Sequence, residues 1–145
     1  MAHAIAERML ERLAWHDAET RSAGVSAFPG GTASEGAIQA AAEQGLALQG
    51  HRSSPLSEEL VEWADVVLTM SAHHLAAVEA HGGHGEATML SAFAEGLEAG
   101  RGWGVPDPFG GDIEAYRDSF RILEELVEAA VARLHRDSRG SGNGP

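Results

Sequence analysis

The spacing of apolar residues predicts two amphipathic helices at opposite ends of the chain. Apolar positions three or four residues apart, separated by charged residues, predict helices over residues 2–13 and 113–134. The long stripe of the second helix is expected to cover a sheet. Residues 136–145 are polar and rich in glycine, which favours a disordered tail. The pattern therefore predicts one compact domain over residues 1–135, followed by this tail.

Three shorter apolar runs have the length of strands. Thr20–Val25 is expected to be a short buried strand, and Asp65–Met70 is a continuous apolar run typical of a parallel strand covered on both faces. Ala87–Leu90 is a further strand candidate. Strands that alternate with helices predict an α/β domain with a parallel sheet, in which ligands gather at the carboxyl ends of the strands.

Capping residues place the helices between these strands. Thr32 or Ser34 is expected to begin a helix that stops at Gly45, because serine and threonine favour the first position and glycine the end. Ser57, followed by two glutamates, predicts a short helix. Ser71 is expected to begin another helix, which leads into a glycine-rich loop.

Composition excludes several classes of function. The 145 residues carry 22 acidic and 10 basic side chains, for a formal charge of −12, which argues against nucleic acid or an anionic membrane as a partner. There is no cysteine, so these residues contain no disulfide, no thiolate zinc site and no thiol nucleophile. The adjacent His73 and His74, and the His81 and His84 spacing, do not form a preorganised metal site, and we expect no metal and no cofactor.

Nothing in the sequence indicates a membrane segment. No apolar run approaches the roughly 20 residues that cross a bilayer. Residues 1–13 are amphipathic, unlike the basic end and continuous apolar core of a signal peptide. We therefore expect a soluble cytoplasmic protein of unknown oligomeric state.

Five segments in order along the chain carry a resemblance to a known family. They are Met1-Ala2, Arg21–Val25, His51–Leu60, Ala64–Met70 and the loop Asp107-Pro108-Phe109-Gly110-Gly111. Together they resemble the low-molecular-weight protein-tyrosine-phosphatase family over residues 1 to about 135. The Ser-Ser-Pro-Leu stretch and the Asp-Pro-Phe-Gly-Gly loop are most similar to its bacterial protein arginine phosphatase branch.

The resemblance implies a metal-free, two-step hydrolysis of phosphorylated proteins. In this family a loop cysteine of a Cys-x5-Arg motif attacks phosphorus, and the phosphocysteine is then hydrolysed. By this resemblance Asp107 is the general acid and then the base that activates water. Phe109 is expected to form one wall of the substrate cleft, and Trp103 lies near enough in sequence to border it.

His51 and Ser22 are expected to support the phosphate loop, His51 through hydrogen bonds. Simpler readings of the same residues remain open. Asp107 also suits a simple turn residue, and Phe109 also suits a core residue that anchors the loop. His51 also suits a structural histidine with no catalytic role. The acceptor specificity, tyrosine or arginine, stays open, although the Asp107–Phe109 loop leans towards arginine.

The family's cysteine, its loop arginine and the strand before them have no counterpart in this sequence. We expect a flavodoxin-like three-layer sandwich whose sheet of about four strands lacks the first, central strand. The chain is expected to be inactive, poorly folded or prone to aggregation, with a true start upstream of Met1. The alternatives are a non-catalytic pseudophosphatase that binds partners, and an arsenate reductase, which would need cysteines that are absent here.

Overall fold

The computed structural model describes residues 1–83, 85–98 and 100–142 as six helices and two strands. In chain order these are α1 (Ala2–Arg12), α2 (Glu35–Glu43), α3 (Glu58–Trp63), β1 (Val66–Thr69), α4 (Ala72–Ala80), β2 (Glu86–Met89), α5 (Leu90–Glu95) and α6 (Ile113–Gly140). The strands β1 and β2 pair in parallel, with Val66 opposite Glu86 and Thr69 opposite Met89. The described residues thus form an α/β fold.

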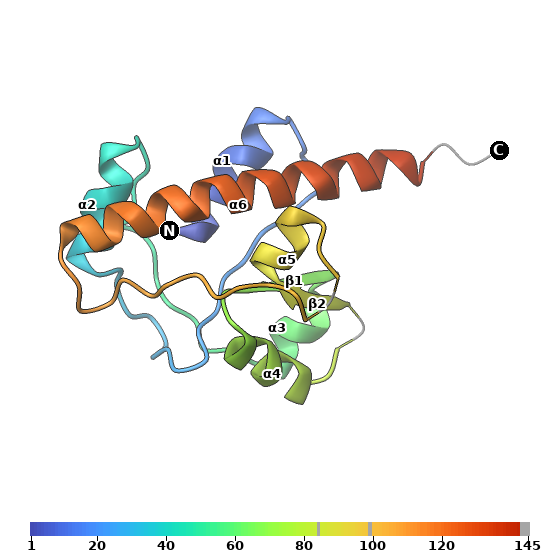
Figure 1. Ribbon diagram of the computed structural model, residues 1–145, viewed down its shortest axis with the longest axis horizontal. Helices are drawn as coiled ribbons and strands as arrows, with labels where there is room; N and C mark the ends of the chain where they lie inside the picture. The colour runs from blue at the N-terminus through green and yellow to red at the C-terminus, as the bar shows by residue number, and fades with distance from the viewer. Residues whose placement is uncertain (84, 99, 143–145) are drawn as a thin grey trace.

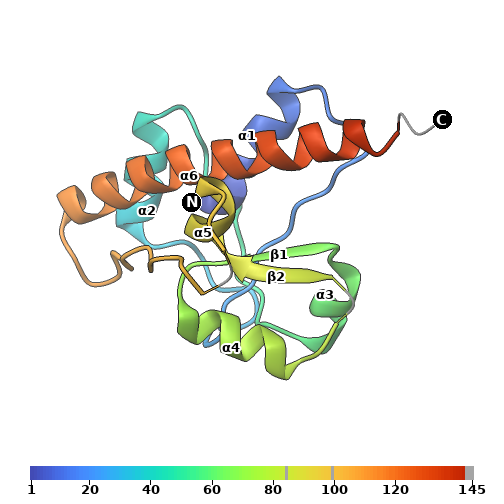
Figure 2. The ribbon, with the colours of Figure 1, turned by 45° about the vertical axis from the view of Figure 1, so that its right-hand side comes forward.

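The molecule is layered around these strands. Helix α6 runs along one side with α1, α2 and α5 against it, while α3 and α4 lie on the other side of the strands (Figures 1 and 2). This is the three-layer arrangement expected for a flavodoxin-like fold. The N-terminus lies in the middle of the molecule, close to α6 (Figure 1).

The core lies between α6 and the three helices that contact it. Ile5 of α1, Ala41 of α2 and Ala130 of α6 are fully enclosed. The buried face of α6 carries Tyr116, Phe120, Leu123, Leu126, Val127, Ala130 and Val131. These residues recur every three or four positions, so the periodicity identified the face that packs inward, although this face packs chiefly on α1, α2 and α5 and not on the sheet, as had been expected.

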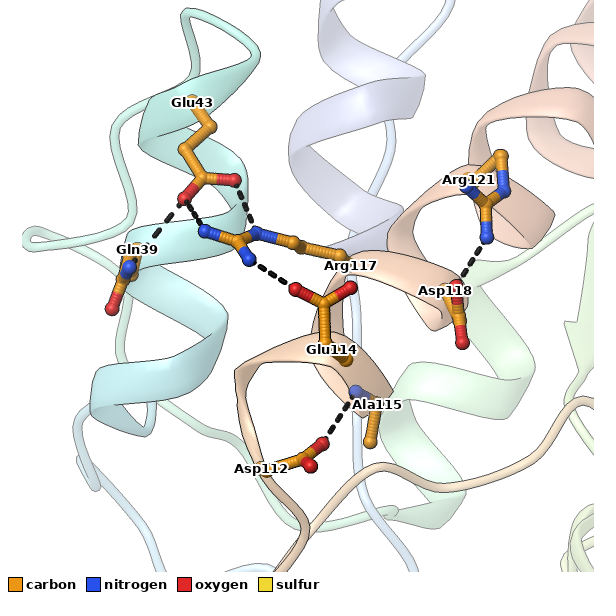
Figure 3. A network of polar contacts seen from close by, with 8 residues as sticks. All are labelled: Gln39, Glu43, Asp112, Glu114, Ala115, Arg117, Asp118 and Arg121. Carbon is orange, nitrogen blue, oxygen red and sulfur yellow. Dashed lines mark hydrogen bonds and ion pairs between the residues drawn. The ribbon is translucent and has the colours of Figure 1, made fainter.

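Polar contacts fix α1 and α2 to α6 at the edge of this core. Arg8 of α1 lies 2.6 Å from Glu124 of α6, and its guanidinium is mostly shielded from solvent. Arg117 of α6 donates to both carboxylate oxygens of Glu43 in α2, at 2.9 and 2.7 Å, and also pairs with Glu114 (Figure 3). A bidentate arginine pair holds two helices in one orientation.

The helix starts follow the capping residues expected from the sequence. The Ser57 hydroxyl accepts from the Leu60 N–H, and that of Ser71 accepts from the His74 N–H, each at 3.2 Å. Ser34, and not Thr32, precedes α2, without a side-chain capping bond. Each capping hydroxyl satisfies one of the amide groups that the first turn of a helix leaves without a partner.

The expected strand at Thr20–Val25 is wrong. This segment is mostly exposed, and its sole β-contact among the described residues is a single parallel bridge between Gly24 and Pro55. A strand needs bonds along its length, and only Gly24 makes them here: it donates to the Ser54 carbonyl and accepts from the Leu56 N–H, each at 2.9 Å. The sheet of the described residues therefore has two strands, where the sequence predicted three of a four-stranded sheet.

Two further elements differ from the sequence prediction. α5 was not anticipated, because its buried run Leu90–Phe93 is continuous and shows no helical period. α6 continues to Gly140, so the expected disordered tail is helical over residues 136–140; residues 143–145 lie outside the described part. Trp15 packs on His135 with ring centroids 5.0 Å apart, which holds this last stretch against the segment after α1. No helix among the described residues is both long and apolar enough to cross a membrane.

Candidate functional site

The segment from Trp103 to Asp112 is tied to the core by a buried serine. Ser91 of α5 is enclosed, and its hydroxyl accepts from the Trp103 N–H at 2.8 Å while donating to the Trp103 carbonyl at 2.7 Å. One hydroxyl thus satisfies both backbone groups of Trp103. The start of the loop is fixed to the helix that follows β2.

Two further bonds position the middle of the loop. The Val105 N–H donates to the carbonyl of Met70, just beyond the end of β1, at 2.8 Å. The buried Ser119 of α6 donates to the Pro106 carbonyl at 3.2 Å. Because these anchors come from the end of β1 and from α6, the loop is held at the carboxyl ends of the strands, where α/β folds bind ligands.

Asp107 follows directly after these anchors and is exposed to solvent. Its Oδ1 accepts from the Phe109 N–H at 3.0 Å, an Asx turn that orients the carboxylate. Gly110 has φ of +80°, and Gly111 donates to the Pro108 carbonyl at 2.8 Å. The two glycines let the chain reverse before α6. Asp112 caps the first turn of α6, because its Oδ1 accepts from the Ala115 N–H at 3.0 Å.

The aromatic residues of the loop face outward. Phe109 is 82% exposed, so it does not anchor the loop in the core. Trp103 is 40% exposed, and its indole N–H donates to Glu95 Oε1 at 3.0 Å. A carboxylate on the same loop as two accessible aromatic side chains can contact a ligand in solution; the role of each of these residues stays a prediction.

A second group of polar residues surrounds the start of α1. His3 Nδ1 lies 3.1 Å from the Ser22 hydroxyl, and its Nε2 lies 3.1 Å from Glu7 Oε1. The His3 and His51 rings meet edge to face, with centroids 6.0 Å apart. Together with Arg52, these residues line a cavity of about 520 Å³.

This cavity disfavours positive charge on His51. Partial burial lowers the pKa of His51, and the charges of the Met1 amino group, His3 and Arg52 lower it further, while Glu7 opposes them. Burial also lowers the pKa of the Met1 amino group. His51 and the Met1 amine are therefore both shifted towards their neutral forms beside the first turn of α1.

The structure does not bring all of the predicted site residues into one cavity. Ser22 and His51 meet through His3, which the sequence did not single out. Asp107, Phe109 and Trp103 share one loop but line neither this cavity nor the larger one beside β1. Ser91 and Ser119, the residues that anchor this loop, were also missed. The only signal for Ser91 is a small polar residue within an apolar run, and that for Ser119 is a small polar residue on the apolar face of α6.

The described residues hold no cluster of three metal-ligating side chains. The His73 and His74 ring centroids lie 6.0 Å apart at an interplanar angle of 55°, and His81 Nδ1 lies 2.8 Å from the Ala77 carbonyl oxygen. His84 lies outside the described residues.

Comparisons with known proteins agree on one family. Residues 1–140 match the family described as low molecular weight phosphotyrosine protein phosphatase. A protein-arginine-phosphatase of Bacillus subtilis is 37% identical and covers 96% of this chain and 90% of its own length. The Escherichia coli low molecular weight protein-tyrosine-phosphatase Etp is 31% identical, and the match spans 91% of this chain and 86% of Etp. A structure of the arginine phosphatase YwlE, in a mutant with a phosphorylated active-site serine, superposes with a TM-score of 0.83 at 35% identity. The superposition covers 95% of this chain and 88% of the YwlE chain.

Proposed function

Since this chain belongs to the low-molecular-weight protein-tyrosine-phosphatase family, we propose that it supplies the general acid and the substrate cleft for hydrolysis of phosphorylated protein side chains. Asp107 is the proton donor, Phe109 and Trp103 flank the leaving group, and His51 and Ser22 support the phosphate-binding side. The reaction uses no cofactor or metal. The proposed location is the cytoplasm, where phosphorylated proteins are available.

The observation that carries this proposal is the anchored loop with its exposed carboxylate. Bonds from Ser91, Met70 and Ser119 fix the residues that lead into the Asp-Pro turn. A general acid needs this kind of support, because it must reach the leaving atom within hydrogen-bond distance.

The nucleophile has to come from outside these 145 residues, because they contain no cysteine. We therefore propose that the chain by itself does not hydrolyse phosphoesters or phosphoramidates. In the arginine phosphatase mutant, the phosphoryl group sits on an active-site serine, which supports a covalent route for the family.

Arginine phosphate is the preferred substrate in this proposal, because the Bacillus subtilis arginine phosphatase is 37% identical and Etp is 31% identical. The bond broken is then P–N. Asp107 would protonate the departing guanidinium nitrogen, which otherwise leaves as a strong base.

The test is a chimera in which the segment that precedes the matched region of the Bacillus subtilis relative, ending in Cys-x5-Arg, is joined to Met1. We expect the chimera to release phosphate from a phosphoarginine-containing protein, and the 145-residue chain to release none. Asp107→Asn in the chimera should lower kcat by about 10²- to 10⁴-fold.

Asp112→Asn is the matched control, because asparagine caps a helix as well as aspartate does and the position lies in the same loop. It should leave kcat unchanged. Equal losses for the two variants would remove Asp107 from the mechanism. Binding of a phosphoprotein by the 145-residue chain without hydrolysis would instead favour the non-catalytic alternative.

A further inference from the structure

Trp103 is held firmly in place although much of its side chain is open to solvent. The enclosed Ser91 hydroxyl bonds to both its N–H and its carbonyl. The preceding Gly102 lies against the core, since a Cβ there would stand 3.0 Å from Met89 Cβ and from Ser91 Oγ. The indole N–H donates to Glu95 Oε1. Trp103 is nevertheless 40% exposed, so the loop presents an aromatic ring whose position is set before any ligand arrives.

Glu95, the partner of this ring, has a second oxygen that is not engaged. Its Oε1 accepts from the indole N–H at 3.0 Å, and the side chain is exposed at the end of α5. Among the described residues, Glu95 Oε2 makes no hydrogen bond or ion pair. A carboxylate can accept several hydrogen bonds through its two oxygens. An anionic acceptor therefore stands at the edge of an accessible aromatic ring.

The other partly exposed tryptophan shows what such a ring and carboxylate bind. The Arg21 guanidinium lies 4.1 Å from the centre of the Trp63 ring, and Arg21 Nε lies 3.1 Å from Glu19 Oε1. Trp63 is 39% exposed, nearly the same as Trp103. The face of an indole ring attracts a cation, and the carboxylate holds the guanidinium by an ion pair. At Trp63 the chain itself supplies all three groups.

At Trp103 the chain supplies two of these groups. In the described part of the molecule, Arg21 and Arg133 are the cations that lie over aromatic rings, and neither lies over Trp103. An arginine of another molecule can supply the third group. Arginine suits this place better than lysine, because its planar guanidinium stacks on a ring while its N–H groups reach a carboxylate. The formal charge of −12 also favours a cationic partner.

We propose that Trp103 and Glu95 form a binding site for an unmodified arginine of the substrate protein, which stacks on the indole ring and pairs with Glu95. The site lies four residues before Asp107, which is at most about 14 Å of extended chain. An extended substrate would thus place this arginine within about four residues of its phosphorylated side chain. That placement rests on the proposed function, whereas the binding of arginine does not.

The first test is an NMR titration of the ¹⁵N-labelled full chain. Its three tryptophans give three indole N–H signals, and Trp103→Phe identifies the signal of Trp103. The probe is the peptide acetyl-Gly-Ala-Arg-Ala-Gly-amide, and the control peptide carries citrulline, which has nearly the same shape without the charge. The Trp103 signal should shift with an affinity at least about threefold higher for the arginine peptide. Equal affinities would overturn the proposal.

A matched pair of variants locates the binding. Glu95→Gln keeps an oxygen that accepts from the indole N–H but removes the charge, so it should weaken binding of the arginine peptide by about threefold to tenfold. Glu98→Gln removes the same charge from an exposed position three residues further on and should leave the affinity unchanged. Equal losses in the two variants would mean that overall charge binds the peptide, and the proposal would be wrong.

The second test uses the active chimera and a pair of phosphoarginine peptides. They differ in having arginine or citrulline three residues to either side of the phosphorylated residue. The arginine-flanked peptide should have a kcat/KM higher by about threefold to tenfold, mainly through a lower KM. Glu95→Gln should bring the ratio of the two values close to one, and Glu98→Gln should preserve it.

The two tests separate a failure of this site from a failure of the proposed function. A chimera that hydrolyses both peptides equally well would overturn the arginine site and leave the proposed function standing. A chimera that hydrolyses neither peptide would contradict the proposed function, while a Trp103 signal that still prefers arginine over citrulline would support the site.

Discussion

The helical half and the sheet side of this molecule are packed to different degrees. Around α6, residues such as Ile5, Ala41 and Ala130 are fully enclosed. In β1, Val66, Val67 and Leu68 are half-buried, and Thr69 alone is buried. The difference comes from what lies next to the two regions.

The contrast shows that a continuous apolar run in the sequence does not by itself mean that the residues are buried in the fold. α6 is covered by α1, α2 and α5, which all belong to the described chain. β1 has a strand on one edge and a cavity of about 870 Å³ beside the other. A central parallel strand is stable when both edges and both faces are covered.

The largest expected effect comes from making the same truncation in each half. Leu123→Ala, in the α6 core, should lower the free energy of unfolding by about 2 to 5 kcal/mol, because it leaves a cavity. Leu68→Ala, in half-buried β1, should cost about 1 kcal/mol. Urea unfolding of both variants measures the difference. Equal losses would mean that β1 is as tightly packed as the helices.

A glycine in α2 tests how closely the helices approach. A Cβ at Gly36 would lie 2.4 Å from the Tyr116 ring, so Gly36→Ala should destabilise the fold by about 1 to 3 kcal/mol through overpacking. Gly140→Ala is the control, since a Cβ there meets no neighbour. In Gly140→Ala the better helix propensity of alanine should make a small gain. Thermal unfolding distinguishes the two signs.

His51, at the boundary of the two halves, is expected to titrate with a pKa below the ordinary histidine value of 6.5, chiefly because of burial. The unfolded chain then binds the proton more tightly, so this residue makes stability fall as the pH drops from 6.5 through the folded pKa. NMR titration of the ring measures the shift. Acetylation of the Met1 amine should raise the His51 pKa, since it removes one neighbouring charge; an unchanged midpoint would exclude the Met1 charge as a cause.

The smallest effect is expected at the exposed ion pair between Glu43 of α2 and Arg117 of α6, called the clamp below. The hydrogen bond from Arg117 lowers the pKa of Glu43, so the clamp stabilises the fold at neutral pH and is lost as the pH falls through the folded pKa of Glu43 (Figure 3). Arg117→Met should move the Glu43 pKa back towards 4.5 and change stability only slightly. Carboxyl NMR titration follows Glu43, with Arg121→Met as the control that removes a neighbouring pair within α6.

Most of the helices could be predicted from the sequence, because their signals are local. The caps at Ser57 and Ser71 and the stripe of α6 lie within a few residues of the elements they define. The strand prediction at Thr20–Val25 failed because a strand depends on partners distant in sequence. α5 was missed because burial on all sides erases its period.

The candidate site shows the same difference between local signals and contacts that are distant in sequence. The Asp-Pro-Phe-Gly-Gly loop is recognisable as a motif, but its anchors Ser91 and Ser119 come from two other helices. His3 connects Ser22 with His51 across a distance that no local pattern encodes. Sequence therefore indicated which residues carry chemistry more readily than which residues hold them in place.

The order of the helices along the chain has a consequence for synthesis. α1, α2 and α5 all pack on α6, which follows them in the sequence and so leaves the ribosome after them. Until then the apolar faces of the earlier helices have no surface to cover them, and they remain open to chaperones or to other chains. The domain is thus expected to fold only after α6 has been synthesised.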